Sequence, residues 1–228
     1  MSKELLRHGD TTINTYIDPG AETKEAYEVS KKSRMLARTM VGNANDEDRV
    51  RQRCSVAVGD FGMADLMRFC NDPVPAALTA LCRGAPIITD IRMVQVGIQK
   101  KGHTSDVICA LDSGAEIAQE RSITRSSAGF IALEEKLAGS IVVIGNAPSA
   151  LLSLCKMINE GICPAVIIGA PVGFVNAAES KELLRTTGVP SISTEGTRGG
   201  TPVAVAAMNE CITIFIEGQK DERSGYRL

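Results

Sequence analysis

The second half of the chain repeats one pattern of apolar and polar positions. An apolar run at 141–145 leads, after a break, into a stretch at 150–160 whose apolar residues recur at helical spacing. A second apolar run at 165–169 leads in the same way into a helical stretch that ends near Arg185. Because both runs are continuous rather than alternating, they predict strands buried on both faces, which is typical of a parallel sheet covered by helices.

Similar units extend over most of the chain. Apolar runs predict further strands at 85–89, 106–111 and 189–194, and apolar spacing predicts further helices at 21–40, 74–83, 90–97, 115–120, about 122–137 and 203–209. Two segments are harder to assign, because 54–58 suits either a short strand or part of a helix, and 64–69 suits a helix. The alternation predicts an α/β protein of three layers, with a mostly parallel central sheet flanked by helices.

No segment of the chain has the composition of a linker between domains. We therefore expect a single domain over residues 1–228, with polar tails at about 1–14 and 217–228. The second tail is expected to fray, and His8 in the first tail is expected to be solvated.

The composition narrows the classes of function. The net charge is -2, aromatic residues make up 4% and Trp is absent, so nucleic-acid binding is not expected. No apolar stretch approaches the length of a membrane span, and the first residues do not begin a signal peptide. The Cys residues number seven and form no C-x-x-C pair, which favours buried, reduced thiols in a cytoplasmic protein. With only His8 and His103 to accompany them, no metal site is expected.

Three turns follow strands and precede helices in the second half of the chain. The carboxyl ends of parallel strands meet at one edge of a sheet, where ligands bind and where helix N-termini offer free N–H groups. A single turn of this kind is usually structural, but three on one edge favour a site for an acidic ligand. None of them matches a nucleotide-binding motif. The expected ligand contacts are Gly145, Asn146, Ala147, Pro171, Val172, Gly173, Phe174, Arg198, Gly199 and Gly200.

Thr124, Arg125 and Ser126 form a second candidate group near the start of a predicted helix. The guanidinium of Arg125 suits a bidentate pair with a substrate carboxylate, although a surface Arg beside a capping hydroxyl fits equally well. Asp90 directly follows a strand, where it can bind substrate or cap a helix. His103 fits a solvated loop better than an acid or base.

Several segments together match one known family. They are residues 84–87 with Asp90 and 93–94, 124–126, 138–151, 171–175 with 178–181, and 198–200. Through these segments the chain resembles the precorrin-8X methylmutases, also called precorrin isomerases, over about residues 15–215.

The resemblance implies a homodimeric α/β enzyme of cobalamin biosynthesis that needs no organic cofactor. Such an enzyme moves a methyl group from C-11 to C-12 of a corrinoid precursor, giving hydrogenobyrinic acid or, from the cobalt-containing substrate, cobyrinic acid. The substrate carries acetate and propionate groups around the ring, which fits the acidic ligand expected from the turns.

By position, the resemblance makes Arg125 an active-site Arg and Ser30 an active-site Ser. It also exposes a departure, because the family's catalytic His falls at Val56, within the segment 53–57. That His is proposed to protonate the macrocycle, and Val cannot donate a proton.

Three hypotheses follow from Val56. The enzyme uses another proton donor, for which His103, Cys54 and Asp60 are the candidates, or it promotes the shift by shaping the substrate. Alternatively, it is a paralogue that binds corrinoids without isomerising them. An enzyme acting on another tetrapyrrole has no support beyond the same residue.

Overall fold

The described residues, 23–224 of this computed structural model, form a six-stranded sheet with the order β1-β6-β5-β4-β2-β3. The strands are β1 (Met67–Cys70), β2 (Ile87–Thr89), β3 (Val107–Cys109), β4 (Ile141–Ile144), β5 (Val166–Gly169) and β6 (Ser191–Thr194). All neighbouring pairs from β6 to β3 are parallel, and β1 joins β6 in the antiparallel sense. The predicted α/β fold with a mostly parallel sheet is confirmed.

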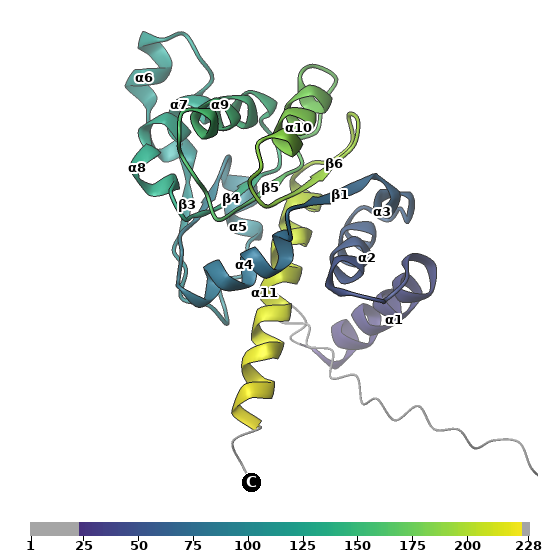
Figure 1. The fold of residues 1–228 in the computed structure, drawn as a ribbon. Helices are drawn as coiled ribbons and strands as arrows, with labels where there is room; N and C mark the ends of the chain where they lie inside the picture. The colour runs from purple at the N-terminus through teal and green to yellow at the C-terminus, as the bar shows by residue number, and fades with distance from the viewer. Residues whose placement is uncertain (1–22, 225–228) are drawn as a thin grey trace, which may run out of the picture.

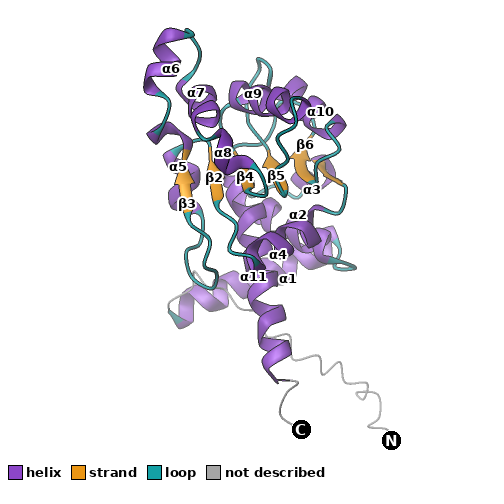
Figure 2. Cartoon of the chain, turned by 60° about the vertical axis from the view of Figure 1, so that its left-hand side comes forward, coloured by secondary structure: helices purple, strands orange, loops and turns teal. Residues whose placement is uncertain are grey.

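Helices cover both faces of this sheet. They are α1 (Lys24–Val41), α2 (Asp46–Val58), α3 (Gly62–Leu66), α4 (Pro73–Cys82), α5 (Arg92–Gly97), α6 (Ala115–Glu120), α7 (Arg125–Ala132), α8 (Glu134–Leu137), α9 (Pro148–Asn159), α10 (Ala177–Thr186) and α11 (Thr201–Ser224), with a 3-10 turn, η1, at Ala110–Asp112. Figures 1 and 2 show α7, α9 and α10 on one side of the sheet, and α4 and α11 on the other. The three layers expected from the sequence are therefore present.

The side chains of the middle strands belong to two separate hydrophobic cores, one on each face of the sheet. In β4, Ile141 and Val143 join the core beneath α2, α4 and α11, whereas Val142 and Ile144 join the core beneath α7, α9 and α10. All four side chains are fully buried. Because successive residues of a strand point to opposite faces, a strand between two helical layers needs apolar residues at every position. This is why the apolar runs were continuous.

The ambiguous region between residues 49 and 69 resolves into two helices and a strand. Residues 54–58 belong to α2, which ends at Gly59 in a left-handed conformation. The helix expected over 64–69 is wrong beyond Leu66, because Met67–Cys70 forms the edge strand β1. Its partner strand is β6, more than a hundred residues later in the sequence. The local sequence around β1 therefore does not predict the pairing.

The last helix is much longer than expected. Helix α11 runs from Thr201 to Ser224, so the frayed tail predicted from residue 217 onward is wrong up to Ser224. Its apolar face, which includes Ala207, Cys211 and Ile214, is buried against the sheet and α2. The polar residues that suggested an end at Asn209 are instead held by side chains of other helices, as described below. His8 and the first polar tail lie outside the described residues.

Within residues 23–224 the structure shows neither a membrane-spanning helix nor a cluster of metal ligands. Within this range, no helix combines the length and apolar character needed to cross a membrane. The same residues contain no group of three or more His, Cys, Asp or Glu arranged to hold a metal ion. All seven Cys residues are free thiols, and Cys54, Cys109, Cys155 and Cys211 are buried. Cys82 and Cys163 are exposed, which corrects the expectation of uniformly buried thiols.

Candidate functional site

A cavity of about 390 Å³ lies where α1, α2 and α11 meet. Each helix presents one face to it, because the lining residues recur at spacings of three and four. The lining residues are Ser30, Ser33 and Arg34 from α1, Arg53, Val56 and Ala57 from α2, and Pro202, Val205, Ala206 and Asn209 from α11. The fold thus brings together Ser30 and Val56, the two positions of the N-terminal region that the sequence marked for function.

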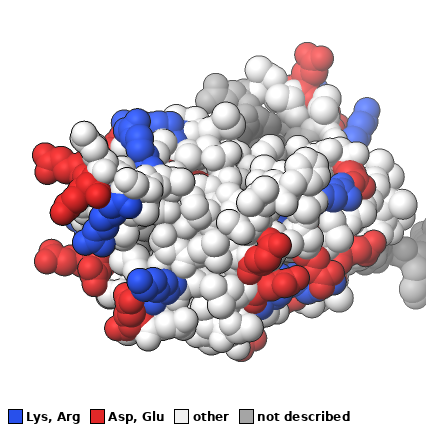
Figure 3. Space-filling model, turned by 90° about the horizontal axis from the view of Figure 1, so that it is seen from above, with Lys and Arg blue, Asp and Glu red and all other residues white. Residues whose placement is uncertain are grey.

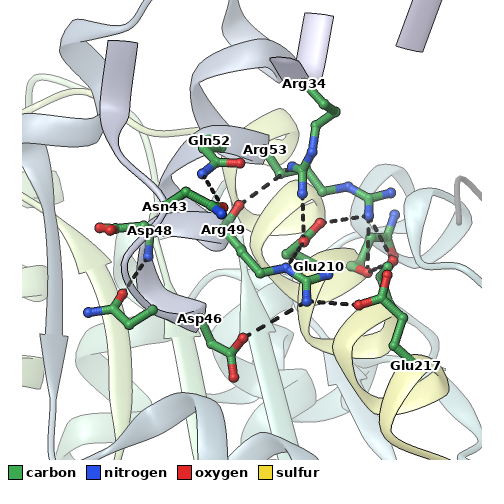
Figure 4. Close-up of polar contacts among 12 residues, drawn as sticks. Arg34, Asn43, Asp46, Asp48, Arg49, Gln52, Arg53, Glu210 and Glu217 are labelled. Carbon is green, nitrogen blue, oxygen red and sulfur yellow. Dashed lines mark hydrogen bonds and ion pairs between the residues drawn. The ribbon is translucent and has the colours of Figure 1, made fainter. Parts of the chain in front are cut away.

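One buried carboxylate holds the three helices together beside this cavity. Glu210 of α11 is fully buried, and its Oε1 accepts from Nη2 of Arg34 at 2.6 Å and from Nε of Arg49 at 3.1 Å. Its Oε2 accepts from Nη1 of Arg53 at 3.1 Å. Figure 4 shows these guanidinium groups converging on Glu210, with Glu217 on the far side of Arg49. Neither the arginines nor Glu210 was identified from the sequence.

The cavity wall is therefore cationic. Arg34 and Arg53 both line it, and none of the lining residues within 23–224 is acidic, because Glu210 lies in the interior and Glu217 pairs with Arg49. Since a guanidinium keeps its charge at any ordinary pH, the wall suits an anionic group such as a carboxylate.

The three turns predicted as a site do lie against one another. The N–H of Gly173 donates to the carbonyl of Thr197 at 3.1 Å, and the N–H of Gly200 donates to the carbonyl of Ala170 at 2.7 Å. A Cβ added at Gly145 would stand 2.8 Å from Cα of Thr201, and one at Gly199, whose φ is +156°, would collide with the carbonyl oxygen of Ala170. Glycine is therefore required at the contact between turns.

Several backbone N–H groups of these turns are bonded within the protein. Asp90 is fully buried, and its carboxylate accepts from the N–H groups of Gly145, Asn146 and Ala147 at 3.2, 2.8 and 2.8 Å. Burial raises the pKa of Asp90, and these three N–H groups oppose that rise. Asp90 thus braces the turn after β4, and its contact with substrate stays a prediction. This bracing also means that the turn does not offer these three N–H groups to an acidic ligand.

Lys181 holds the Gly-rich turn at 196–200, before α11, in place through hydrogen bonds. Although its side chain is charged, Lys181 is fully buried. Its Nζ donates to Oγ1 of Thr194 at 3.0 Å and to the carbonyl of Arg198 at 2.7 Å. Burial, with a smaller contribution from Arg185, lowers the pKa of Lys181 to about 8. The side chain of Arg198 points outward and pairs with Asp60 at the end of α2.

Arg125 stands apart from the cavity. It is exposed at the first residue of α7, and its Nη2 donates to the carbonyl of Leu111 at 3.1 Å. Thr124 caps α7 by accepting from the N–H of Ser127, and its hydroxyl also bonds Ser149 at the start of α9, at 2.9 Å. Ser126 is buried. Arg125 therefore belongs to the carboxyl edge of the sheet near β3, and it does not line the cavity that holds Ser30 and Val56.

None of the three substitute proton donors lines the cavity. Cys54 is fully buried, its Sγ donates to the carbonyl of Val203, and burial raises its pKa far above the ordinary value. His103 uses both ring nitrogens, with Gln99 and Ser105. The ion pair with Arg198 lowers the pKa of Asp60, which therefore stays ionised near neutral pH.

Large apolar side chains are exposed close to the turns. Phe174 is 95% exposed, Val175 is 76% exposed and Val172 is 46% exposed, all in the turn after β5. Met93 and Val96 on α5, which follows β2, are also exposed. On the side of the molecule that carries α7, α9 and α10, Figure 3 shows charged residues mainly at the rim around an uncharged centre. Three exposed apolar side chains within one turn favour a contact surface there.

Comparisons with known proteins agree with the resemblance noted in the sequence. The family model described as "Precorrin-8X methylmutase" matches residues 28–214. The chain is 39% identical to the cobalt-precorrin-8 methylmutase of Methanothermobacter thermautotrophicus, over 86% of this chain and 96% of that protein. It is 40% identical to the precorrin-8X methylmutase of Pseudomonas aeruginosa, over 76% of this chain and 87% of the other. The solved structure titled as precorrin-8x methyl mutase from Thermus thermophilus superposes with a TM-score of 0.78 at 34% identity, covering 84% of this chain and 97% of that one.

The fold, the family model and the similar sequences together define the class of protein. The chain belongs to the precorrin-8X methylmutase family. The predicted enzyme class, an isomerase of cobalamin biosynthesis, is confirmed at the level of this family.

Proposed function

We propose that this chain catalyses the migration of a methyl group from C-11 to C-12 of precorrin-8X or cobalt-precorrin-8. The products are hydrogenobyrinic acid and cobyrinic acid respectively. The observation that carries the proposal is the cavity between α1, α2 and α11, which unites Ser30 and the family's catalytic position with a cationic wall. It is supported by membership of the methylmutase family over residues 28–214.

The reaction is intramolecular, so its demands on the protein are modest. One carbon–carbon bond breaks at C-11 and another forms at C-12, with no gain or loss of atoms or electrons and no organic cofactor. The protein has to hold the ring in the reactive geometry, exclude competing reactions and favour the charge distribution of the transition state. Arginines held in place by other side chains suit the first of these tasks, because the substrate is fringed with carboxylates.

The proposed site extends from this cavity to the adjoining turns. Ser30 lines the cavity itself. Arg198, Gly199 and Gly200 lead directly into α11, whose residue Pro202 is part of the wall. Arg125 remains a proposed active-site residue at the carboxyl edge of the sheet, where its exposed side chain is open to a carboxylate of the same substrate.

A second candidate function is corrinoid binding without isomerisation. The observation that favours it is Val56, which occupies the family's His position and lines the cavity with a side chain that cannot donate a proton. Loss of a general acid typically lowers the rate by about 10²- to 10⁴-fold. A protein with this lesion would still bind the ligand.

The test is to mix the purified chain with precorrin-8 and, separately, with its cobalt form, and to follow the visible spectrum. Because the methyl shift changes the conjugation of the ring, we expect a progressive spectral change with many turnovers per protein chain. A stoichiometric shift that then stops would support binding alone. No spectral change with either substrate would contradict both candidates.

We also propose that the protein acts as a homodimer in the cytoplasm. The exposed apolar side chains of Val172, Phe174 and Val175 support a partner surface. The seven free thiols support a reducing compartment, since oxidising compartments pair cysteines.

A further inference from the structure

We propose that Lys181 is a positioning residue for the reaction. It fixes the backbone at Arg198, so that the Arg198 side chain holds the carboxyl end of α2 beside the cavity. The inference rests on the proposed function and adds to it a residue that acts without touching substrate. Because Lys181 is fully buried, any effect on the reaction passes through its hydrogen-bond partners.

The turn at 196–200 depends on bonds from outside for its shape. Three of its five residues are glycines with positive φ, so the backbone has little rigidity of its own. At its centre, the carbonyl of Arg198 accepts from Nζ of Lys181 and from Oγ1 of Thr194, each at 2.7 Å. Nζ of Lys181 also donates to Oγ1 of Thr194 at 3.0 Å. This triangle of hydrogen bonds fixes the peptide group that follows Arg198.

Lys181 reaches the turn from the opposite helical layer. It lies on α10, which covers the same face of the sheet as α7 and α9, whereas the turn leads into α11 on the other face (Figures 1 and 2). Both acceptors of its ammonium group are neutral oxygens. Burying an ammonium group against neutral acceptors alone costs free energy that an apolar residue would avoid. A cost of this kind is typical of functional sites, and here it indicates that the position supplies hydrogen-bond donors rather than packing.

The side chain of Arg198 connects the turn to α2. Its Nη2 pairs with Oδ2 of Asp60, which lies two residues beyond the end of that helix. The N–H of Asp60 donates to the carbonyl of Ser55 at 3.0 Å, so Asp60 is tied to the last turn of α2. Val56 and Ala57 of this last turn line the cavity. A displacement of Arg198 therefore reaches the cavity wall.

The ion pair between Arg198 and Asp60 needs this support because it is exposed. About half of each side chain is open to solvent, 51% for Arg198 and 41% for Asp60. Exposed pairs contribute little by themselves, since ordering two side chains offsets most of the electrostatic attraction. A backbone already fixed by Lys181 lowers that ordering cost. Without Lys181 the pair should form only part of the time, and a misplacement of about 1 Å at the wall can lower the rate by about 10²-fold.

The experiment compares Lys181→Met, Arg198→Ala and the double variant in turnover of precorrin-8 or its cobalt form. We expect Lys181→Met to lower kcat by about 10- to 100-fold and to leave KM within about threefold, because the groups that bind substrate remain. If Lys181 acts through Arg198, the double variant should be within about twofold of the slower single variant. A loss equal to the product of the two single losses would overturn the inference. Where Lys181→Met does not fold, Thr194→Val removes the third member of the triangle and takes its place in the comparison.

The matched control is Arg185→Gln, one turn further along α10. Arg185 donates to Oγ of Ser193 on β6 at 3.2 Å, so it joins the same helix to the same strand without a bond to the turn. Its loss should leave kcat within about twofold. An equal loss of kcat from this control would assign Lys181 a purely structural role and contradict the inference.

Hydrogen exchange tests the connection independently of activity. In Lys181→Met, the amides of 55–60 and 196–200 should exchange at least about fivefold faster than in the wild-type protein, and Arg185→Gln should leave both segments unchanged. Unchanged exchange at 55–60 in Lys181→Met would overturn the inference, whether or not the protein turns over substrate. Wild-type protein that neither binds nor converts precorrin-8 would instead overturn the proposed function.

Discussion

Val56 is the residue on which the activity of this chain depends most directly. Its side chain is 38% exposed and faces the same cavity as Ser30 and Arg53. The donors considered from the sequence do not compensate for it, because Cys54, His103 and Asp60 all lie outside the lining of the cavity. Among residues 23–224, the cavity lining includes no His, Cys, Asp or Glu, so the described cavity residues can promote the methyl shift through positioning and charge.

Val56→His should restore a proton donor at this position. The partly exposed site has room for an imidazole, so we expect folding to be preserved and the turnover rate to rise about tenfold or more. The gain should be larger at lower pH, because the imidazole donates only when protonated, and the cationic wall lowers its pKa below the usual value of about 6.5. Stopped-flow spectra of the methyl shift from pH 5.5 to 8 would measure this.

The control for that change is Ala57→His, which adds the same side chain to the same wall one position further along. Only the variant at position 56 should gain activity. Equal gains from both would mean that any imidazole in the cavity suffices. No gain from either, in a wild-type protein that turns over substrate, would show that the site promotes the shift without an acid at this position.

Glu210 is the residue whose loss should most disturb the fold around the cavity. Glu210→Gln removes the buried charge that three converging guanidinium groups share, so we expect a loss of about 3 kcal/mol in the free energy of unfolding. Glu217→Gln is the matched control on the same helix, where a more exposed pair with Arg49 should cost less than about 1 kcal/mol. Urea unfolding curves would compare them, and equal losses would contradict the assignment of Glu210 as the centre of the cluster.

At the scale of elements, the errors of sequence-based prediction have a common cause. β1 was missed because its four residues form an edge strand whose only partner, β6, is distant in sequence. The sequence-based prediction ended α11 at Asn209, whereas Glu210 is buried through its bonds to arginines of α1 and α2 and the helix continues. Continuous apolar runs such as 141–145 were assigned correctly, because two buried faces leave a signal in the run itself.

Lys181 connects α10 to the Gly-rich turn, and its titration should be visible in stability. The unfolded chain keeps this Lys protonated up to about pH 10.5, whereas the folded protein releases the proton at about pH 8. Between these values the unfolded state binds more protons, so stability rises with pH. Lys181→Met abolishes this contribution, and the wild-type free energy of unfolding should therefore rise relative to that of the variant from pH 8 to 10. A difference that stays constant over this range would contradict the lowered pKa.

At the scale of the whole molecule, the sequence was informative about architecture and the edge of the sheet, and less so about the cavity. The turns after β4, β5 and β6 do meet, as expected from parallel strands. Several of their N–H groups, however, are bonded to Asp90, Thr197 and Ala170, so these groups are already used within the protein. A sequence shows that an Arg exists at position 53, but only the packing of α1, α2 and α11 shows that it faces a cavity.

The exposed turn after β5 gives the last prediction, which concerns assembly. A Phe that is 95% exposed beside a Val that is 76% exposed is costly in water, and association would remove both from it. We expect light scattering of the wild-type protein to give twice the chain mass of 24.2 kDa, and Phe174→Asp with Val175→Asp to give the monomer mass at micromolar concentration. Met40→Asp, which replaces a similarly exposed apolar residue at the far end of α1, should remain dimeric. A wild-type monomer, or a double variant that stays dimeric, would show that this turn serves another purpose, such as covering the bound ring.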